Sequence, residues 1–198
     1  MARSFLFLLG SARADGNAEL LARAAAEQLP GGTGQRWLNL ERLRLPDFHD
    51  ARHAAGSWPQ EESDEDLLRE ATLAATDVVI VSPLYWYSVS SYAKRYLDYW
   101  SKWLSTPDPG FKARMAGRTL WGVTAMADRE PVRAEPLILT LNHTAAYMGM
   151  RFGGVLLGNG SRPGQVLSDE RAAVEAKTFF AQEAPLARFP DAERSSAG

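Results

Sequence analysis

The sequence predicts a three-layer, doubly wound α/β fold around a five-stranded parallel sheet with strand order 2-1-3-4-5. Five apolar runs lack the polar alternation of half-exposed strands, which is typical of strands covered on both faces. They alternate with segments of helical composition, and this alternation favours parallel crossover units. The length of 198 residues and the 45% hydrophobic composition suit a single domain, expected over residues 1–184, with a disordered tail over residues 185–198.

Each expected strand is an apolar run that ends at a turn-forming residue. The first run ends at Gly10, and the third ends at Pro83, which cannot donate to a ladder. The second run is less hydrophobic, which favours an edge position. We expect strands over residues 3–9, 35–40, 77–81, 118–126 and 151–157.

Helices are expected over residues 17–29, 64–75, 88–104, 131–148 and 168–181. Ser63 and Ser168 suit N-cap positions, and Pro131 is tolerated in a first turn. Within 88–104, aromatic residues follow helical spacing, but Tyr99 lies off that stripe. Because Trp and Tyr are enriched in interfaces, we expect a homodimer through this helix; the pairing of two such dimers stays open.

Composition excludes several classes of function. The 22 basic and 24 acidic residues give a net charge of −2, so neither nucleic acid nor an anionic membrane is an expected partner. Without cysteine, any redox chemistry must come from a cofactor. The first ten residues are too short for a membrane span, and we expect a cytoplasmic location. His49 and His53 lie four residues apart, but a solvated loop explains them better than a metal site, and no metal is expected.

Two loops carry the candidate chemistry. The segment from Gly10 to Ala18 combines free amides at a helix start with a hydroxyl and a guanidinium, which suits a phosphate monoester, although a plain tight turn is the alternative. The segment from Ser82 to Ser88 places three aromatic residues after a strand, where they can hold a flat ring or simply cap the core. Strand order 2-1-3-4-5 makes these loops neighbours, and so predicts one pocket.

These segments resemble a known family. GSARADGNAELLA is similar to the G-S-x-R-x-x-G-N-[ST] loop of NADPH-dependent FMN reductases and related flavodoxin-like NAD(P)H:quinone oxidoreductases. SPLYWYSVSSYAKRYLD resembles their P-x-Y-x-x-S-x-x-x-x-x-K-x-x-x-D segment, and LPDFHDAR and NGSRPGQVLSDERA are also similar to family segments.

The resemblance implies a flavodoxin-like domain that binds FMN, with NADPH or NADH as a transient co-substrate. The implied phosphate contacts are Ser11, Arg13, Gly16, Asn17 and Ala18, where Ala18 departs from the usual Thr or Ser. The implied ring and ribityl contacts are Pro83, Leu84, Tyr85, Trp86, Tyr87 and Ser88. The third wall is expected from residues 124–128, with Thr124, Ala125 and Asp128 as the implied contacts, where the family often carries a Ser/Gly-rich turn.

The resemblance implies an FMN-dependent NAD(P)H oxidoreductase that passes hydride to a quinone, free flavin or similar small acceptor. The flavin itself accepts the hydride, so no side chain is expected to be catalytic. We expect backbone amides of residues 85–88 to stabilise negative charge on the ring. The alternatives are a flavodoxin-type electron carrier, which the balanced charge disfavours, and a non-redox phosphate-binding protein.

Overall fold

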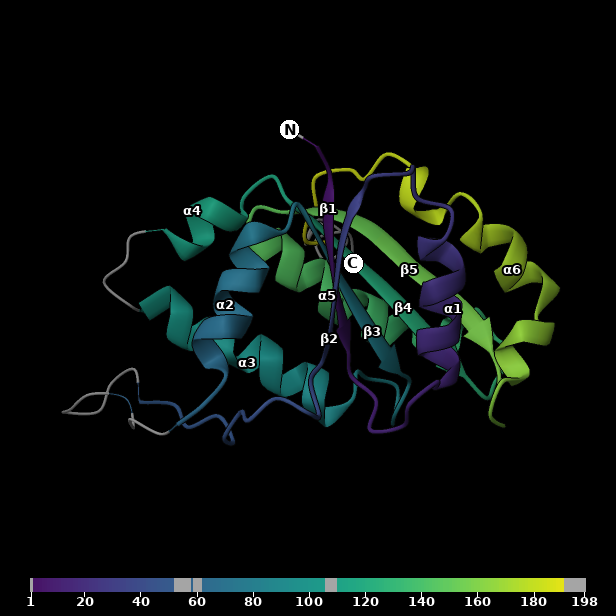
Figure 1. Cartoon of the computed structure of the whole chain (residues 1–198), viewed down its shortest axis with the longest axis horizontal. Helices are drawn as coiled ribbons and strands as arrows, with labels where there is room; N and C mark the ends of the chain where they lie inside the picture. The colour runs from purple at the N-terminus through teal and green to yellow at the C-terminus, as the bar shows by residue number, and fades with distance from the viewer. Residues whose placement is uncertain (1, 52–57, 59–61, 106–109, 191–198) are drawn as a thin grey trace, which may run out of the picture.

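The computed structural model describes residues 2–51, 58, 62–105 and 110–190, and it contains one parallel sheet between two layers of helices (Figure 1). The strand order β2-β1-β3-β4-β5 confirms the predicted topology. β2 lies at an edge, as its weaker hydrophobicity indicated. The strands are β1 (Ser4–Leu9), β2 (Gly34–Asn39), β3 (Asp77–Pro83), β4 (Thr119–Met126) and β5 (Arg151–Asn159).

The apolar runs are continuous because each central strand buries both faces. In β1, Phe5 and Phe7 pack on one side of the sheet, while Leu6 and Leu8 pack on the other. One side is covered by α1 (Asn17–Ala26) and α6 (Glu170–Ala176), and the other by α2 (Glu65–Ala74), α3 (Ser91–Ser105), α4 (Phe111–Met115) and α5 (Glu135–Tyr147). Among the described helices, none is long and apolar enough to cross a membrane.

The helix starts differ from the sequence-based expectation at two caps. The N-cap residues of α2 and α6 are Asp64 and Asp169, each one residue after the predicted serine. Asp169 caps α6 because its carboxylate accepts a hydrogen bond from Ala172 N at 3.1 Å. Ser63 is close to its expected role, since its hydroxyl accepts from Glu65 N at 3.4 Å.

The expected helices over 131–148 and 168–181 are each interrupted. A 3-10 turn, η1 (Pro131–Ala134), precedes α5. Similarly, η2 (Gln165–Ser168) precedes α6, and η3 (Phe179–Ala181) follows it. Proline at Pro136 removes one N–H donor near the start of α5, which suits a break in the hydrogen-bond pattern there.

The predicted disordered tail from residue 185 is wrong for residues 185–190. Phe152 N donates to Pro185 O at 2.9 Å, and Ala187 N donates to Met150 O at 3.0 Å. Asn142 Nδ2 also donates to Arg188 O at 2.9 Å. Main-chain bonds to β5 and to Met150 just before it therefore fix this segment, which its two prolines and lack of regular apolar spacing did not indicate. Residues 191–198 lie outside the described part of the chain.

The aromatic residues of α3 are core residues. Tyr96, Tyr99, Trp100 and Trp103 are all buried, so Tyr99 does not lie on an exposed side as the spacing suggested. The chain after β2 returns across α3 and supplies an acceptor, since Tyr99 OH donates to Pro46 O at 3.0 Å. The aromatic content of this helix is explained within one chain, and it does not by itself support a dimer.

The contact between β5 and Trp121 gives a stability prediction. A Cβ on Gly153 would lie 2.1 Å from Trp121 Cε3, and this ring is held by a 2.9 Å bond from its Nε1 to Asp77 Oδ1. Gly153→Ala should therefore lower the free energy of unfolding by about 2–3 kcal/mol in urea titrations, as expected for an overpacked core. Gly31→Ala, where nothing lies within 4 Å of the added methyl, is the control. Equal losses in the two variants would contradict this packing account.

Candidate functional site

A cavity of about 320 Å³ opens at the carboxyl end of the sheet, where the loops after β1, β3, β4 and β5 meet. The direct pairing of β1 with β3 brings the first two loops together, and Gly10 N donates to Val81 O at 2.7 Å. The lining residues are Ser11, Arg13, Ala14, Asp15, Gly16, Asn17, Ala18, Pro83, Leu84, Tyr85, Ala125, Met126, Ala127, Gly160, Ser161 and Pro163. Nine of these sixteen residues are among the contacts expected from the sequence, and Met126 and Ala127 also lie within the expected third wall.

One end of the cavity carries unsatisfied hydrogen-bond donors. The N-cap of α1 is Gly16, which has no side chain to cap the helix, and the first intrahelical bond runs from Leu20 N to Gly16 O at 2.9 Å. Within the described residues, no atom accepts from the N–H groups of Asn17, Ala18 or Glu19. Three free amides at the positive end of a helix dipole favour an anion.

Two side chains add to this anion site. Ser11 Oγ accepts from Arg13 N at 3.1 Å, so its own hydrogen remains available for a ligand. Arg13 is exposed, and its guanidinium has no acidic partner among the described residues. A guanidinium beside free amides matches the two- or three-oxygen geometry of a phosphate.

Asn17 has a different role from the one expected for its side chain. Its Nδ2 donates to Arg162 O at 2.9 Å, and its Oδ1 accepts from Val166 N at 3.4 Å. The side chain thus joins the start of α1 to the loop after β5, leaving the backbone N–H for a ligand. The junction is tight, because a Cβ on Gly160 would lie 2.8 Å from Val166 N and 3.1 Å from Asn17 Nδ2.

The aromatic loop after β3 is a tight hairpin turn. Tyr85 N donates to Ser88 O and Ser88 N to Tyr85 O, both at 3.0 Å. The two central residues have positive φ, 48° at Trp86 and 64° at Tyr87, where glycine or asparagine is normal. Side chains this large in the left-handed region cost about 1–2 kcal/mol each.

This turn divides the predicted ring contacts into two groups. Pro83, Leu84 and Tyr85 line the cavity, whereas Trp86, Tyr87 and Ser88 do not. Trp86 is 94% exposed. The amides of Tyr85 and Ser88 are used by the turn itself, which narrows the expected charge-stabilising amides of residues 85–88 to those of Trp86 and Tyr87.

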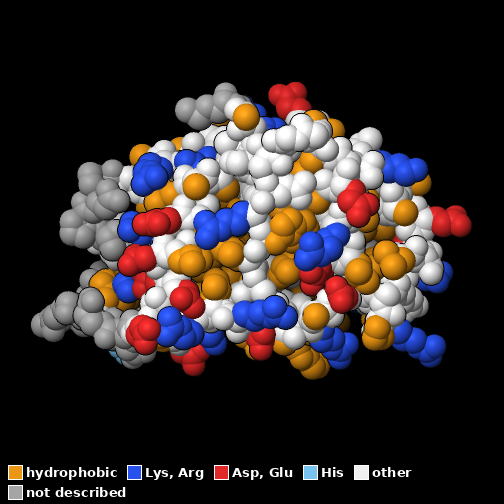
Figure 2. All heavy atoms as spheres, in the orientation of Figure 1, with side chains coloured by type: hydrophobic (Ala, Val, Ile, Leu, Met, Phe, Trp, Pro, Cys, Tyr) orange, Lys and Arg blue, Asp and Glu red, His pale blue; other side chains and the backbone are white. Residues whose placement is uncertain are grey.

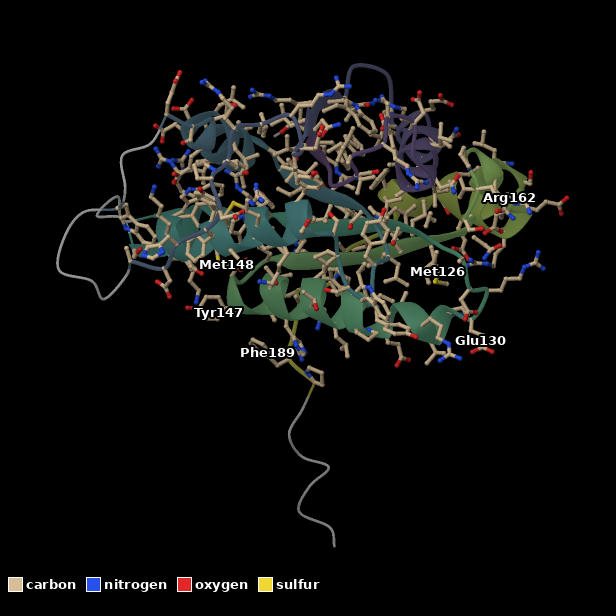
Figure 3. The ribbon with its side chains drawn as sticks, turned by 90° about the horizontal axis from the view of Figure 1, so that it is seen from below. Met126, Glu130, Tyr147, Met148, Arg162 and Phe189 are labelled. Atoms are coloured by element: carbon tan, nitrogen blue, oxygen red, sulfur yellow. The ribbon has the colours of Figure 1, made fainter. Side chains whose placement is uncertain are left out.

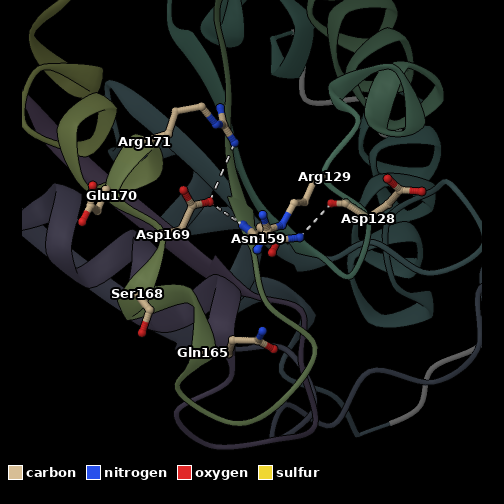
Figure 4. A pocket seen from close by; sticks show the side chains of 8 residues that line it. All are labelled: Asp128, Arg129, Asn159, Gln165, Ser168, Asp169, Glu170 and Arg171. Carbon is tan, nitrogen blue, oxygen red and sulfur yellow. Dashed lines mark hydrogen bonds and ion pairs between the residues drawn. The ribbon is translucent and has the colours of Figure 1, made fainter.

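The cavity wall formed by the end of β4 and the turn after it also differs from the sequence-based expectation. Ala125, Met126 and Ala127 line the cavity, but Thr124 is fully buried within β4. Asp128 does not line this cavity but belongs to the lining of a separate polar depression of about 390 Å³, whose residues are drawn in Figure 4. Its lining residues are Asp128, Arg129, Asn159, Gln165, Ser168, Asp169, Glu170 and Arg171.

The wall that sequence reasoning missed comes from the loop after β5. Gly160, Ser161 and Pro163 line the cavity, and Arg162 lies at the same end of the molecule as Met126 (Figure 3). The turn-rich segment NGSRPG after a predicted strand was the available signal. Because all strands are parallel, its loop had to meet the other loops at the same edge of the sheet.

Side-chain acceptors fix this loop in place. Gln165 Oε1 accepts from Ser161 N at 3.0 Å and from Arg162 N at 3.1 Å. Asp169 Oδ2 accepts from Asn159 N at 2.8 Å (Figure 4). Burial alone would raise the pKa of Asp169, but bonds from the Asn159 and Ala172 amides and the charge of Arg171 hold the pKa below its ordinary value.

The metal alternative gains no support from the described residues. No group of three or more His, Asp or Glu side chains in the described ranges could hold a metal ion. His53, one of the two histidines considered, lies outside those ranges.

A protein-family model described as "Flavodoxin-like fold" matches residues 3–179. The chain belongs to this family. It is 31% identical over 172 residues to a Bacillus subtilis (strain 168) protein named as an NAD(P)H-dependent FMN-containing oxidoreductase, YwqN, covering 86% of this chain and 93% of that protein. The resemblance found in the sequence motifs is thereby confirmed at the level of the family.

Solved structures agree with this assignment of the fold. The Trp repressor binding protein of Bacillus subtilis has 26% identity and a TM-score of 0.73, covering 91% of this chain and 99% of that one. An NADPH-quinone reductase from P. pentosaceus has 17% identity and a TM-score of 0.56, covering 90% and 97%, and shows likeness of fold alone.

Asp169 gives a prediction for pH dependence. Because its pKa is depressed in the folded chain, its carboxylate stabilises the fold fully above the ordinary aspartate pKa of about 4, and this contribution is lost as the pH falls through the lower folded value. Asp169→Asn should cost about 1 kcal/mol at pH 7, and the difference from the unaltered chain should shrink toward pH 3. Urea titrations at a series of pH values measure this; a difference that does not vary with pH would contradict it.

Proposed function

We propose that this flavodoxin-like chain is an FMN-dependent NAD(P)H oxidoreductase that passes hydride from NADPH or NADH to a quinone, free flavin or similar small acceptor. The observation that carries the proposal is a cavity whose one end suits a phosphate and whose other end suits a flat ring. The name of the B. subtilis relative supports the same cofactor and donor. The reduced nicotinamide points to a cytoplasmic location, which we include in the proposal.

The residues of the cavity divide the work of binding FMN. The N–H groups of Asn17, Ala18 and Glu19, with the Ser11 hydroxyl and Arg13, hold the phosphate. Leu84 and Tyr85 on one side, and Ala125 to Ala127 on the other, bound the ring. The bound flavin accepts and releases the hydride, so the chain's task is to bind, orient and shield it.

The balance of charge supports an enzyme over an electron carrier. Basic and acidic side chains are interspersed on the face in Figure 2, and the net charge is −2. A carrier that docks to protein partners relies on a field of one sign. Steady-state oxidation of NADPH by the FMN-loaded chain with a soluble benzoquinone separates the two: sustained turnover supports the enzyme, and a single stoichiometric reduction contradicts it.

Arg13 gives a direct test of the phosphate end. A hydrogen bond to a charged group contributes about 1.5–3 kcal/mol to the free energy of binding, so Arg13→Gln should weaken FMN binding at least about tenfold. Quenching of flavin fluorescence measures this affinity. Arg36→Gln, on the exposed part of β2, is the matched control and should bind FMN like the unaltered chain. Equal affinity in both variants would remove Arg13 from the proposed site.

We also propose a homodimer, formed through the outer side of α3 and α5. A groove between these helices is lined by Leu97, Leu104 and Tyr147, among others. Leu139 and Tyr147 are 44% and 56% exposed, and Tyr147 and Phe189 lie on the outer side of α5 in Figure 3. An apolar, exposed helix face of this kind is typical of a buried interface.

Light scattering after gel filtration should give twice the chain mass of 21.8 kDa. The double variant Leu139→Glu/Tyr147→Glu should shift this to one chain mass, because it buries two charges in the interface. Leu167→Glu, on the exposed η2 turn, is the control and should stay dimeric. A single-chain mass for the unaltered protein at micromolar concentration would rule out the dimer.

A further inference from the structure

One amide side chain holds the whole turn that follows β4. Asn159, the last residue of β5, donates from Nδ2 to the carbonyl oxygens of Met126, Ala127 and Asp128, at 3.3, 3.0 and 2.9 Å. Asn159 is itself held, because its backbone N donates to Asp169 Oδ2 at 2.8 Å (Figure 4). Three successive carbonyl groups therefore point toward a single nitrogen.

Because peptide bonds are planar, the direction of these three carbonyl groups also fixes the direction of the N–H groups that follow them. In a trans peptide, the N–H of one residue points opposite to the C=O of the residue before it. The N–H groups of Ala127, Asp128 and Arg129 must then point away from Asn159. Within the described residues, no atom accepts a hydrogen bond from any of the three.

The register of the sheet shows which side these amides face. Met126 O accepts from Gly160 N at 2.9 Å, so the peptide between Met126 and Ala127 directs its carbonyl to β5 and its N–H to β3. On the β3 side, Leu84 N donates to Ala125 O at 3.3 Å, and the chain beyond it lines the cavity. The Ala127 N–H is therefore directed over the end of β3, where the cavity lies.

We propose that Asn159 is a positioning residue that sets the turn from Met126 to Asp128 so that the free Ala127 amide donates to a carbonyl oxygen of a bound flavin ring. This inference rests on the proposed function. It also accounts for the departure from the family's Ser/Gly-rich turn at residues 124–128: a turn without glycine is held in shape from outside by one side chain. The aromatic loop has fewer free donors for the ring than its length indicates, since the Tyr85 and Ser88 amides are already paired.

The test compares two variants of Asn159 with a matched control. Asn159→Ala removes the amide, and Asn159→Asp keeps its size but replaces the donor with a carboxylate facing three carbonyl oxygens. Asn142→Ala removes a similar bond, from Nδ2 to Arg188 O at 2.9 Å, at a site outside the cavity lining. Both Asn159 variants should bind FMN at least about tenfold more weakly than the unaltered chain, whereas Asn142→Ala should bind within about twofold of it.

Amide hydrogen exchange gives a readout that a purely structural role would not move. In the unaltered chain, FMN should slow the exchange of the Ala127 amide, and in Asn159→Ala at saturating FMN this protection should be lost. Unchanged exchange of the Ala127 amide on FMN binding would overturn the inference without any variant. An Asn159→Ala variant whose FMN affinity lies within about twofold of the unaltered chain would also overturn it. Failure of the unaltered chain to bind FMN would instead overturn the proposed function, and this inference with it.

Discussion

The site depends on the direct pairing of β1 with β3. These two strands are far apart in the sequence, but their pairing places the loop with the free α1 amides beside the loop that contains Tyr85. Because every strand of the sheet is parallel, the loops after β4 and β5 reach the same edge. The crossover between strands also directs the amino end of α1 to this edge, so the proposed phosphate and ring contacts are brought together by one topology.

Side-chain amides do much of the work of shaping the loops. Asn17 joins α1 to the loop after β5, Gln165 folds that loop upon itself, and Asn159 holds the turn after β4. Each side chain satisfies main-chain groups that would otherwise face water or a ligand. The cavity walls are thus fixed before any ligand binds, which lowers the entropy cost of binding.

The strands, their order and the position of the first loop at one end of the cavity could be predicted from the sequence. Unbroken apolar runs require burial on both faces, and the first loop carries its chemistry in consecutive residues. The exact lining was not predictable in the same way. Thr124 lies inside a strand, and Trp86 and Tyr87 adopt positive φ although neither residue type signals it. Residues 185–190 contain two prolines and have no regular apolar spacing, yet their main chain bonds to β5 and to Met150 just before it.

The features that the sequence did not predict have a common physical origin. Asn159 acts on the Met126 carbonyl from 33 residues away, and Asn17 reaches Arg162 across 145 residues. Such contacts arise only in the tertiary structure, so the local spacing of residue types in the sequence cannot predict them. The same holds for Tyr99, which is buried because the chain returns to Pro46.

The central claim is that the free amides of α1 and Arg13 recognise the phosphate of a flavin mononucleotide. Parallel titrations of the apoprotein with FMN and with riboflavin, which differ only in that phosphate, test it most directly. The account predicts that FMN binds at least about tenfold more tightly, since a charged phosphate contact alone contributes about 1.5–3 kcal/mol. Equal affinity for the two flavins would contradict it.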